Sequence, residues 1–493
     1  MNYYSTRGDK TPFKASEAII KGLANDGGLF VPESFPALIG NLKDYSDMEY
    51  KEVAFNVLKA FLDDYTDEEL MACVNGAYDE KFDDKLIAPL KKVGEEFYLE
   101  LFHGKTIAFK DMALSILPYL LTTAMKKNNI NENVVILTAT SGDTGKAALA
   151  GFADVPGTGI IVFYPKGGVS RVQELQMVTQ KGDNTTVIGV HGNFDDCQSA
   201  VKRMFSDEVL GADLKEKGYI FSSANSINIG RLIPQVAYYV YAYSRMVKSG
   251  EINCGDTLNF TVPTGNFGNI LAGFYAKKMG VPVGKLICAS NENKVLYDFF
   301  QTGEYNKNRE FILTTSPSMD ILISSNFERL VYYSCDNNAE KTSAFMKQLQ
   351  TEGAYTVTEE MKAKMSDFCG VFASENDVAG TIASTYKEEG YVMDTHTAVA
   401  AFADRAYKAE SGDGTKSVIV STASPYKFSR SVLKAIDPEY DKVEDDFKLI
   451  DELKTISKVD IPNAVLEIMN ADIRHNIVCD VDAMESKVRE TLK

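Results

Sequence analysis

Six short runs of β-branched and aliphatic residues recur between residues 134 and 421, and this recurrence constrains the fold more than any other feature. Each run is followed by a turn and a helical pattern of about ten or more residues. Such alternation indicates parallel sheets with helices on their faces, because parallel strands need long crossover connections. The predicted strands are Val134–Leu137, Ile160–Phe163, Thr186–Val190, Leu258–Val262, Leu286–Ala289 and Val418–Ser421.

The segments before and after these strands have a different character. Residues 1–95 combine turns with helical patterns, which predicts an α-rich N-terminal lobe. We expect a large lobe formed by residues 96–130 and 245–445, and a smaller αβα lobe formed by residues 131–244. Residues 446–493 are predicted to be a helical C-terminal tail. A chain of 493 residues is long enough for this number of lobes.

Composition excludes several classes of function. The formal net charge of −17 repels nucleic acid and anionic membranes, so an anionic small substrate would need a local positive pocket. The seven cysteines are widely separated and form no CxxC pair, and only four histidines are present, so we expect neither a disulfide framework nor a metal site. We find no apolar signal core and no run of 18 apolar residues. We therefore expect a cytoplasmic protein.

One lysine stands in an otherwise apolar segment at a predicted helix entry. Lys110 follows Ala108 and Phe109 and precedes Met112, Ala113 and Leu114. Partial desolvation would disfavour its charged form and favour a nucleophilic amine, as a Schiff-base lysine requires. The alternative is a lysine that extends from an amphipathic helix to solvent, and the segment by itself favours this alternative.

Two glycine-containing turns follow predicted strands, where open α/β sheets bind ligands. The turn at 138–145 carries several hydroxyl groups, including those of Ser141 and Thr144, and the turn at 263–269 carries Gly265 and Gly268. Each turn precedes a predicted helix, so backbone N–H groups could surround an anion. An ordinary capped turn is the alternative for the first, and a glycine-rich turn is a weak signal for the second.

Two further polar segments complete the set. Arg231 opens an apolar helix and could bind a carboxylate or phosphate, although a surface ion pair is the commoner role for such an arginine. Thr422 ends the last strand, where its hydroxyl could donate to a ring nitrogen, and Lys427 adds a positive charge nearby. The sequence contains no Ser/His/Asp order and no GxSxG or HExxH motif that would indicate a different catalytic centre. A reactive lysine with anion-binding turns is what a pyridoxal phosphate enzyme needs.

Several segments together resemble the threonine synthases of the bacterial and fungal type, which are fold-type II pyridoxal phosphate enzymes. The resemblance extends over nearly the whole chain, from GLANDGGLFVP near the start to Asp394–Val399. The matching segments in order are LFHGKTIAFKDMAL, ILTATSGDTGKAALAGF, SSANSINIGRLIPQ, VPTGNFGNILAGFYAKKMGVPV and VSTASPYKF.

The resemblance implies a fold like that of the tryptophan synthase β subunit: two open parallel-sheet αβα lobes, the larger binding the cofactor and the smaller mobile. It implies that Lys110 forms the Schiff base with pyridoxal 5'-phosphate and that Thr422 is the partner of the pyridine nitrogen. It assigns the cofactor phosphate to Gly265, Asn266, Phe267, Gly268 and Asn269. Candidates for the substrate's carboxylate or phosphate are Ser141, Thr144, Asn228, Arg231 and Lys427.

The implied reaction converts O-phospho-L-homoserine and water to L-threonine and phosphate by γ-elimination and β-replacement, the last step of threonine biosynthesis. Lys110 would move protons at Cα and Cβ. Alternatives are a related pyridoxal phosphate phospholyase, a threonine or serine dehydratase, or a silent binding protein on this scaffold. Two departures from the family pattern are Ser424, where histidine is common, and Lys105, where proline is common. The sequence leaves open whether the protein is a monomer or a homodimer.

Overall fold

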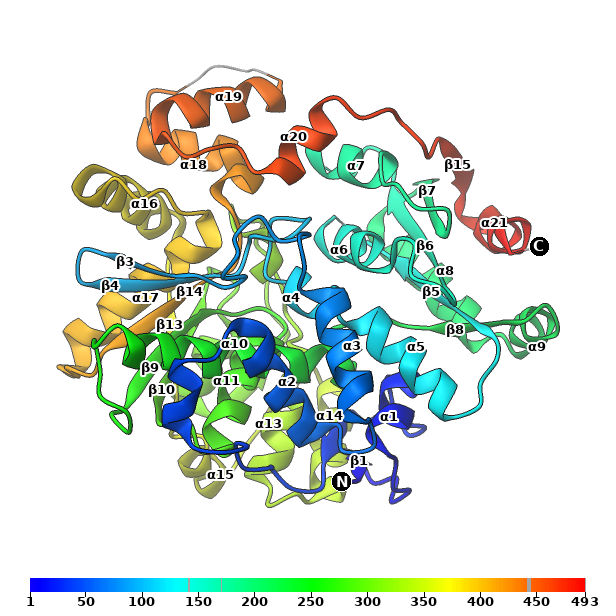
Figure 1. Cartoon of the computed structure of the whole chain (residues 1–493), viewed down its shortest axis with the longest axis horizontal. Helices are drawn as coiled ribbons and strands as arrows, with labels where there is room; N and C mark the ends of the chain where they lie inside the picture. The colour runs from blue at the N-terminus through cyan, green and yellow to red at the C-terminus, as the bar shows by residue number, and fades with distance from the viewer. Residues whose placement is uncertain (141, 170, 441–444, 493) are drawn as a thin grey trace.

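The computed structural model of the protein describes residues 1–493 apart from 141, 170, 441–444 and 493. Two mainly parallel sheets organise the chain into two lobes (Figure 1). All six predicted strands are present, three within β5, β6 and β7 of the smaller sheet and three within β9, β10 and β14 of the larger. The predicted pair of α/β lobes is thereby confirmed.

The larger sheet has the strand order β13-β10-β9-β14-β4-β3. The strands from β13 to β4 run parallel, whereas β3 and β4 form an antiparallel hairpin that crosses the domain boundary expected at residue 95. β9 and β14 are buried along their whole length, as expected of a parallel sheet with both faces covered. The strands are β3 (Leu90–Val93), β4 (Glu96–Glu100), β9 (Leu258–Pro263), β10 (Val283–Ser290), β13 (Phe368–Phe372) and β14 (Ser417–Ser421).

Helix α10 lies in the large lobe, although most of it falls within residues 131–244, which we expected to form the smaller lobe, and it is buried along almost its entire length. It contacts α11 and also α2 of the N-terminal lobe, so it joins two layers of the molecule. The main helices of the large lobe are α10 (Ile229–Lys248), α11 (Gly268–Lys278), α12 (Val295–Thr302), α16 (Glu375–Glu389), α17 (Thr395–Ser411), η3 (Pro425–Phe428) and α18 (Ser429–Ile436). Between α12 and β13 lie β11 (Glu304–Asn306), η2 (Pro317–Met319), α13 (Phe327–Ser334), α14 (Ala339–Thr351), β12 (Ala354–Thr356) and α15 (Glu359–Lys364).

The smaller sheet is entirely parallel, with the order β15-β7-β6-β5-β8. Its strands are β5 (Asn133–Ala139), β6 (Thr158–Pro165), β7 (Thr185–His191), β8 (Tyr219–Ser222) and β15 (Ile477–Asp480). The accompanying helices are α6 (Asp143–Phe152), α7 (Arg171–Val178), α8 (Phe194–Ser206) and α9 (Glu208–Glu216). Before them in the chain lie α4 (Asp111–Leu114), which contacts α10, and α5 (Leu117–Lys127), which contacts α1 of the N-terminal lobe. Helix α6 lies so close to α4 that a Cβ on Gly151 would stand 2.2 Å from the carbonyl oxygen of Leu114.

The C-terminal segment differs from the helical tail that we predicted. It contains α19 (Asp446–Ser457), α20 (Asn463–Met469), η4 (Val481–Ala483) and α21 (Met484–Thr491), but its strand β15 also pairs in parallel with β7. β15 is a short, largely exposed edge strand, and its apolar run, Ile477–Cys479, is shorter than those of the predicted strands. In Figure 1 this segment passes from α18 of the large lobe across to β15, and it thus connects the two lobes.

The N-terminal lobe packs against α10 and α5, with the Tyr65 hydroxyl donating to the Leu120 carbonyl at 2.9 Å. It consists of β1 (Tyr3–Ser5), α1 (Ala15–Lys21), β2 (Phe30–Pro32), η1 (Leu42–Ser46), α2 (Tyr50–Phe61) and α3 (Asp67–Ala77). Within the described part of the chain, no helix combines the length and apolar character needed to cross a bilayer.

Candidate active site

Backbone pairing brings Lys110 and Thr422 together although they are far apart in the sequence. Ala108 and Ala423 form an antiparallel bridge just beyond the end of β14. On one side of the bridge the N–H of Phe109 donates to the carbonyl of Thr422 at 2.8 Å. The segment before the predicted nucleophile therefore lies directly beside the predicted partner of a ring nitrogen.

Lys110 has the apolar setting that the sequence predicts. It is the N-cap residue of α4 and is half-buried, while Met112, Ala113 and Leu114 of the same short helix are buried. A lysine extending from an exposed helix face is therefore not the arrangement here, since α4 presents no exposed face.

The carboxylate that follows Lys110 is buried and firmly held. Asp111 accepts hydrogen bonds from the hydroxyl and the N–H of Thr106 at 2.6 and 2.8 Å. Burial raises the pKa of Asp111, against the opposing effects of these bonds and of the charges on Lys146 and Lys427. Lys146 is only 2% exposed. Two further lysines therefore lie close enough to act on the carboxylate beside Lys110, and one of them, Lys146, is not among the site residues predicted from the sequence.

The loop between β9 and α11 has the shape of an anion-binding nest. Phe267, the N-cap of α11, has φ of 63°, which most residues avoid. Its ring is buried, with its centroid 5.0 Å from that of Phe327 and 5.5 Å from that of Phe368, and this packing supports the backbone conformation. A Cβ on Gly265 would lie 2.7 Å from the Ser318 carbonyl oxygen, so this position requires glycine.

The carbonyl groups of this loop point away from the nest. The Ser324 hydroxyl donates to the Gly265 carbonyl at 2.7 Å, and the N–H and Nδ2 of Asn326 both donate to the Asn266 carbonyl at 3.0 Å. In a trans peptide the N–H points opposite to the carbonyl, so the N–H groups of Asn266 and Phe267 point the other way. Among the described residues none accepts a hydrogen bond from either group.

Asn269 adds a buried donor at the start of α11. Its Oδ1 accepts hydrogen bonds from the hydroxyls of Tyr238 and Tyr239 at 2.6 and 2.7 Å. Its buried Nδ2 has no acceptor among the residues that the structure describes. Since a buried donor without a partner is costly, this amide group is suited to an anionic ligand at the same helix end.

The loop between β5 and α6 contains two of the predicted substrate-binding residues. Ser141 lies outside the described residues, and Thr144 is half-buried in the first turn of α6. Thr140, which the sequence analysis did not single out, shapes this loop because its hydroxyl oxygen accepts from the N–H groups of Gly142 and Gly145 at 3.0 and 3.1 Å.

Asn228 and Arg231 occupy the start of α10 but differ in what they offer a ligand. Asn228 caps the helix by accepting from the Gly230 N–H at 2.8 Å, and its Nδ2 donates to the Ile19 carbonyl at 3.0 Å. Its amide is therefore used within the protein. Arg231 is 4% exposed and donates to the Ala224 carbonyl at 2.8 Å, while its Nε lacks an acceptor among the described residues. Burial lowers the pKa of Arg231 to about 10.

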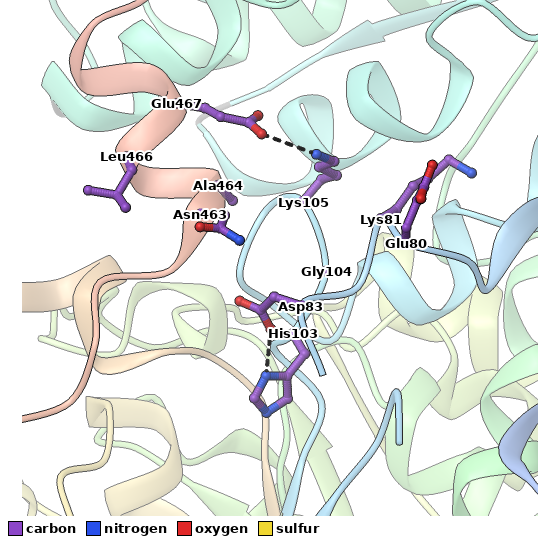
Figure 2. A pocket seen from close by; sticks show the side chains of 10 residues that line it. All are labelled: Glu80, Lys81, Asp83, His103, Gly104, Lys105, Asn463, Ala464, Leu466 and Glu467. Atoms are coloured by element: carbon purple, nitrogen blue, oxygen red, sulfur yellow. Dashed lines mark hydrogen bonds and ion pairs between the residues drawn. The ribbon is translucent and has the colours of Figure 1, made fainter. Parts of the chain in front are cut away.

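Ser424 and Lys105, the two departures from the family pattern, have local roles in the structure. The Ser424 hydroxyl oxygen caps η3 by accepting from the Tyr426 N–H at 3.4 Å. Lys105 lies 3.5 Å from Glu467 of α20, across a cavity of about 380 Å³ shown in Figure 2. The positive charge of Lys105 is therefore directed to the C-terminal segment.

The same cavity contains His103, whose ring is hydrogen-bonded at both nitrogens. Asp83 lies 2.8 Å from Nδ1 and Glu100 lies 3.0 Å from Nε2, and Figure 2 shows the Asp83 contact. Burial by itself lowers the pKa of His103, but the two carboxylates outweigh it and raise the pKa to about 9. This charged cluster fixes the loop that leads to Lys110.

Comparison with known proteins agrees with this geometry. Three family descriptions match the chain: threonine synthase N terminus over residues 2–78, pyridoxal-phosphate dependent enzyme over 86–423, and threonine synthase C-terminal over 397–475. Threonine synthase of Schizosaccharomyces pombe is 37% identical over 468 residues, which cover 88% of this chain and 89% of that protein. The chain belongs to the threonine synthase family.

Two further relatives define the extent of the likeness. The solved structure of pyridoxal phosphate-bound threonine synthase from Brucella melitensis has a TM-score of 0.87 and 33% identity, with 100% of both chains covered. Threonine synthase-like 1 of Macaca fascicularis is 41% identical over 436 residues, or 85% of this chain. The chain spans 58% of the length of that relative.

The residues described above fit the phosphorylated cofactor of this family. The N–H groups of the nest and the Nδ2 of Asn269, which has no acceptor among the described residues, belong to the loop and first turn at the start of α11. This donor set contains no carboxylate and suits a dianionic phosphate.

Proposed function

We propose that the protein is a threonine synthase that uses pyridoxal 5'-phosphate to convert O-phospho-L-homoserine and water to L-threonine and phosphate. The observation that carries this proposal is the backbone pairing that sets Lys110 beside Thr422. Membership of the threonine synthase family supports the same substrate.

The geometry of the two loops supports the cofactor roles that we propose. We assign attachment of the cofactor to Lys110, the pyridine nitrogen to the Thr422 hydroxyl, and the phosphate to the loop from Gly265 to Asn269. When bound, the cofactor supplies the electron sink that lets protons leave the carbons next to the substrate amine. From its partly desolvated position, the Lys110 amine would move protons at Cα and Cβ of the substrate.

The family resemblance and the charges of Arg231 and Lys427 support the substrate roles that we propose. We assign the substrate's carboxylate and phosphate to Ser141, Thr144, Arg231 and Lys427, while Asn228 holds the start of α10 in place. These cations offset the net charge of −17 that would otherwise repel a phosphorylated substrate. We also propose that the protein works in the cytoplasm as a monomer or homodimer and binds neither nucleic acid nor membrane.

A coupled assay of threonine and phosphate tests the proposal. With O-phosphohomoserine as substrate, the wild-type protein is expected to release phosphate and form threonine in equal amounts, and Lys110→Ala is expected to form neither. Phosphate with 2-oxobutyrate but no threonine would indicate a phospholyase instead. Conversion of threonine or serine without use of the phosphorylated substrate would indicate a dehydratase.

A further inference from the structure

A fully buried guanidinium links three segments that meet behind the phosphate-binding nest. Arg329 of α13 is 0% exposed. Its Nε donates to the Phe30 carbonyl of β2 at 2.9 Å, and one terminal nitrogen donates to the Ile227 carbonyl at 2.7 Å. The other terminal nitrogen donates to Oδ1 of Asn326. One side chain is thus hydrogen-bonded to three parts of the molecule: the N-terminal lobe, the segment before α10, and Asn326, which contacts the nest.

The bond to Asn326 sets the orientation of an amide group. Because Arg329 occupies Oδ1, the Nδ2 of Asn326 faces the opposite side, where it donates to the Asn266 carbonyl at 3.0 Å. Asn326 is 0% exposed and also lies close to the nest, since a Cβ on Gly268 would stand 3.3 Å from its Nδ2. The side-chain amide and the backbone N–H of Asn326 together hold the direction of the Asn266 carbonyl, and hence of the next N–H.

We propose that Arg329 is a positioning residue for the cofactor phosphate, acting through Asn326 on the nest at Asn266 and Phe267. This proposal rests on the assignment of the phosphate to that loop. Arg329 also holds Ile227, which directly precedes the cap residue of α10. The same guanidinium therefore holds two parts of the site in a fixed relative position: the loop from Gly265 to Asn269 and the start of α10, the helix that carries Arg231.

A purely structural role would account for the three hydrogen bonds of Arg329 but would not predict an effect on the cofactor phosphate. A buried arginine carries a large desolvation cost, which these hydrogen bonds offset. Burial lowers the pKa of Arg329, in keeping with that cost. What an apolar residue cannot replace is the combination of a positive charge behind a phosphate site with donors that orient Asn326.

Arg245 offers a matched control. It is a half-buried arginine of α10 that donates to three carbonyls of the N-terminal lobe, those of Tyr45, Ser46 and Met48, at 2.7–3.1 Å. No hydrogen bond connects it to the nest among the described residues. Removal of either guanidinium costs hydrogen bonds to the N-terminal lobe. Of the two arginines, only Arg329 is connected, through Asn326, to the loop from Gly265 to Asn269.

The test compares Arg329→Met with Arg245→Met in the full chain. Cofactor titration of the apoprotein gives the Kd for pyridoxal phosphate, and the ³¹P resonance of the holoprotein reports the setting of its phosphate. We expect Arg329→Met to raise the Kd about tenfold or more and to move the ³¹P resonance. Arg245→Met is expected to lower the melting temperature but to leave Kd and ³¹P shift at wild-type values.

A second variant keeps the test decisive if Arg329→Met does not fold. Asn326→Asp retains an acceptor for Arg329 but places a carboxylate oxygen against the Asn266 carbonyl, so Kd and ³¹P shift should change in the same way. Wild-type values for both measurements in a folded Arg329→Met protein, or in Asn326→Asp, would overturn the inference. Failure of the wild-type protein to bind the cofactor would instead refute the proposed function.

Discussion

Replacing Gly265 with alanine tests whether the turn after β9 is shaped for a bound phosphate. The new Cβ would lie 2.7 Å from the Ser318 carbonyl oxygen, well inside the 3.4 Å at which ordinary contact begins. That carbonyl cannot retreat easily, because the Ser318 N–H donates to Nε2 of His396 at 3.1 Å and the other ring nitrogen lies 2.7 Å from Asp394. Both His396 and Asp394 are buried. The Gly265 turn must therefore move instead.

The size of the effect follows from the cost of overpacking, about 1–3 kcal/mol. If binding of the cofactor restores the original turn, that cost appears as a Kd for pyridoxal phosphate about 5- to 150-fold higher. Titration of the apoprotein followed by absorbance measures this change. Gly380→Ala within α16 is the control, since no atom lies within 4 Å of its Cβ position, and its Kd should equal the wild-type value. A Kd for Gly265→Ala within twofold of wild type would refute the reasoning.

Two further predictions concern the loops around Lys110. Thr140→Val removes the acceptor of the Gly142 and Gly145 N–H groups, at a cost of about 1–3 kcal/mol. We expect this variant to have a higher KM for O-phosphohomoserine and an unchanged Kd for the cofactor. Equal rises in KM and Kd would contradict the assignment of this loop to the substrate. His103→Gln should destabilise the fold in a pH-dependent way. Because Asp83 and Glu100 raise the pKa of His103 to about 9, its contribution is complete below its unfolded pKa of about 6.5 and is lost as the pH rises through 9. Urea unfolding should give a loss of at most about 3 kcal/mol at pH 6 and almost none at pH 10, whereas equal losses at both would show that the charge of His103 does not matter.

The features that could be predicted from the sequence are those encoded locally. Six strands of the two sheets, β5, β6, β7, β9, β10 and β14, were recognisable because they form continuous apolar runs, as expected of strands buried on both faces such as β9 and β14. Lys110 was recognisable because its apolar neighbours are adjacent in the chain. The glycine-rich turn was recognisable because the sterics at Gly265 require that residue.

The features that could not be predicted depend on contacts between distant segments. Nothing near Arg329 or Asn326 in the sequence indicates that they support a turn about sixty residues earlier. The contact between the Asn228 amide and the Ile19 carbonyl could not be predicted, because Ile19 lies in the N-terminal lobe about two hundred residues earlier in the chain. β15 was missed since an exposed edge strand of four residues depends on its pairing with β7 rather than on its own apolar pattern.

The central claim is that Lys110 holds the cofactor, and borohydride reduction of the holoprotein followed by peptide mapping tests it most directly. Reduction makes the bond between lysine and cofactor permanent, so the modified residue can be identified by mass. Lys146 and Lys427 act on the same carboxylate, Asp111, and are the competing candidates. We predict one cofactor per chain on the peptide that contains Lys110. Modification of Lys146 or Lys427 in place of Lys110, or no modification at all, would contradict this claim.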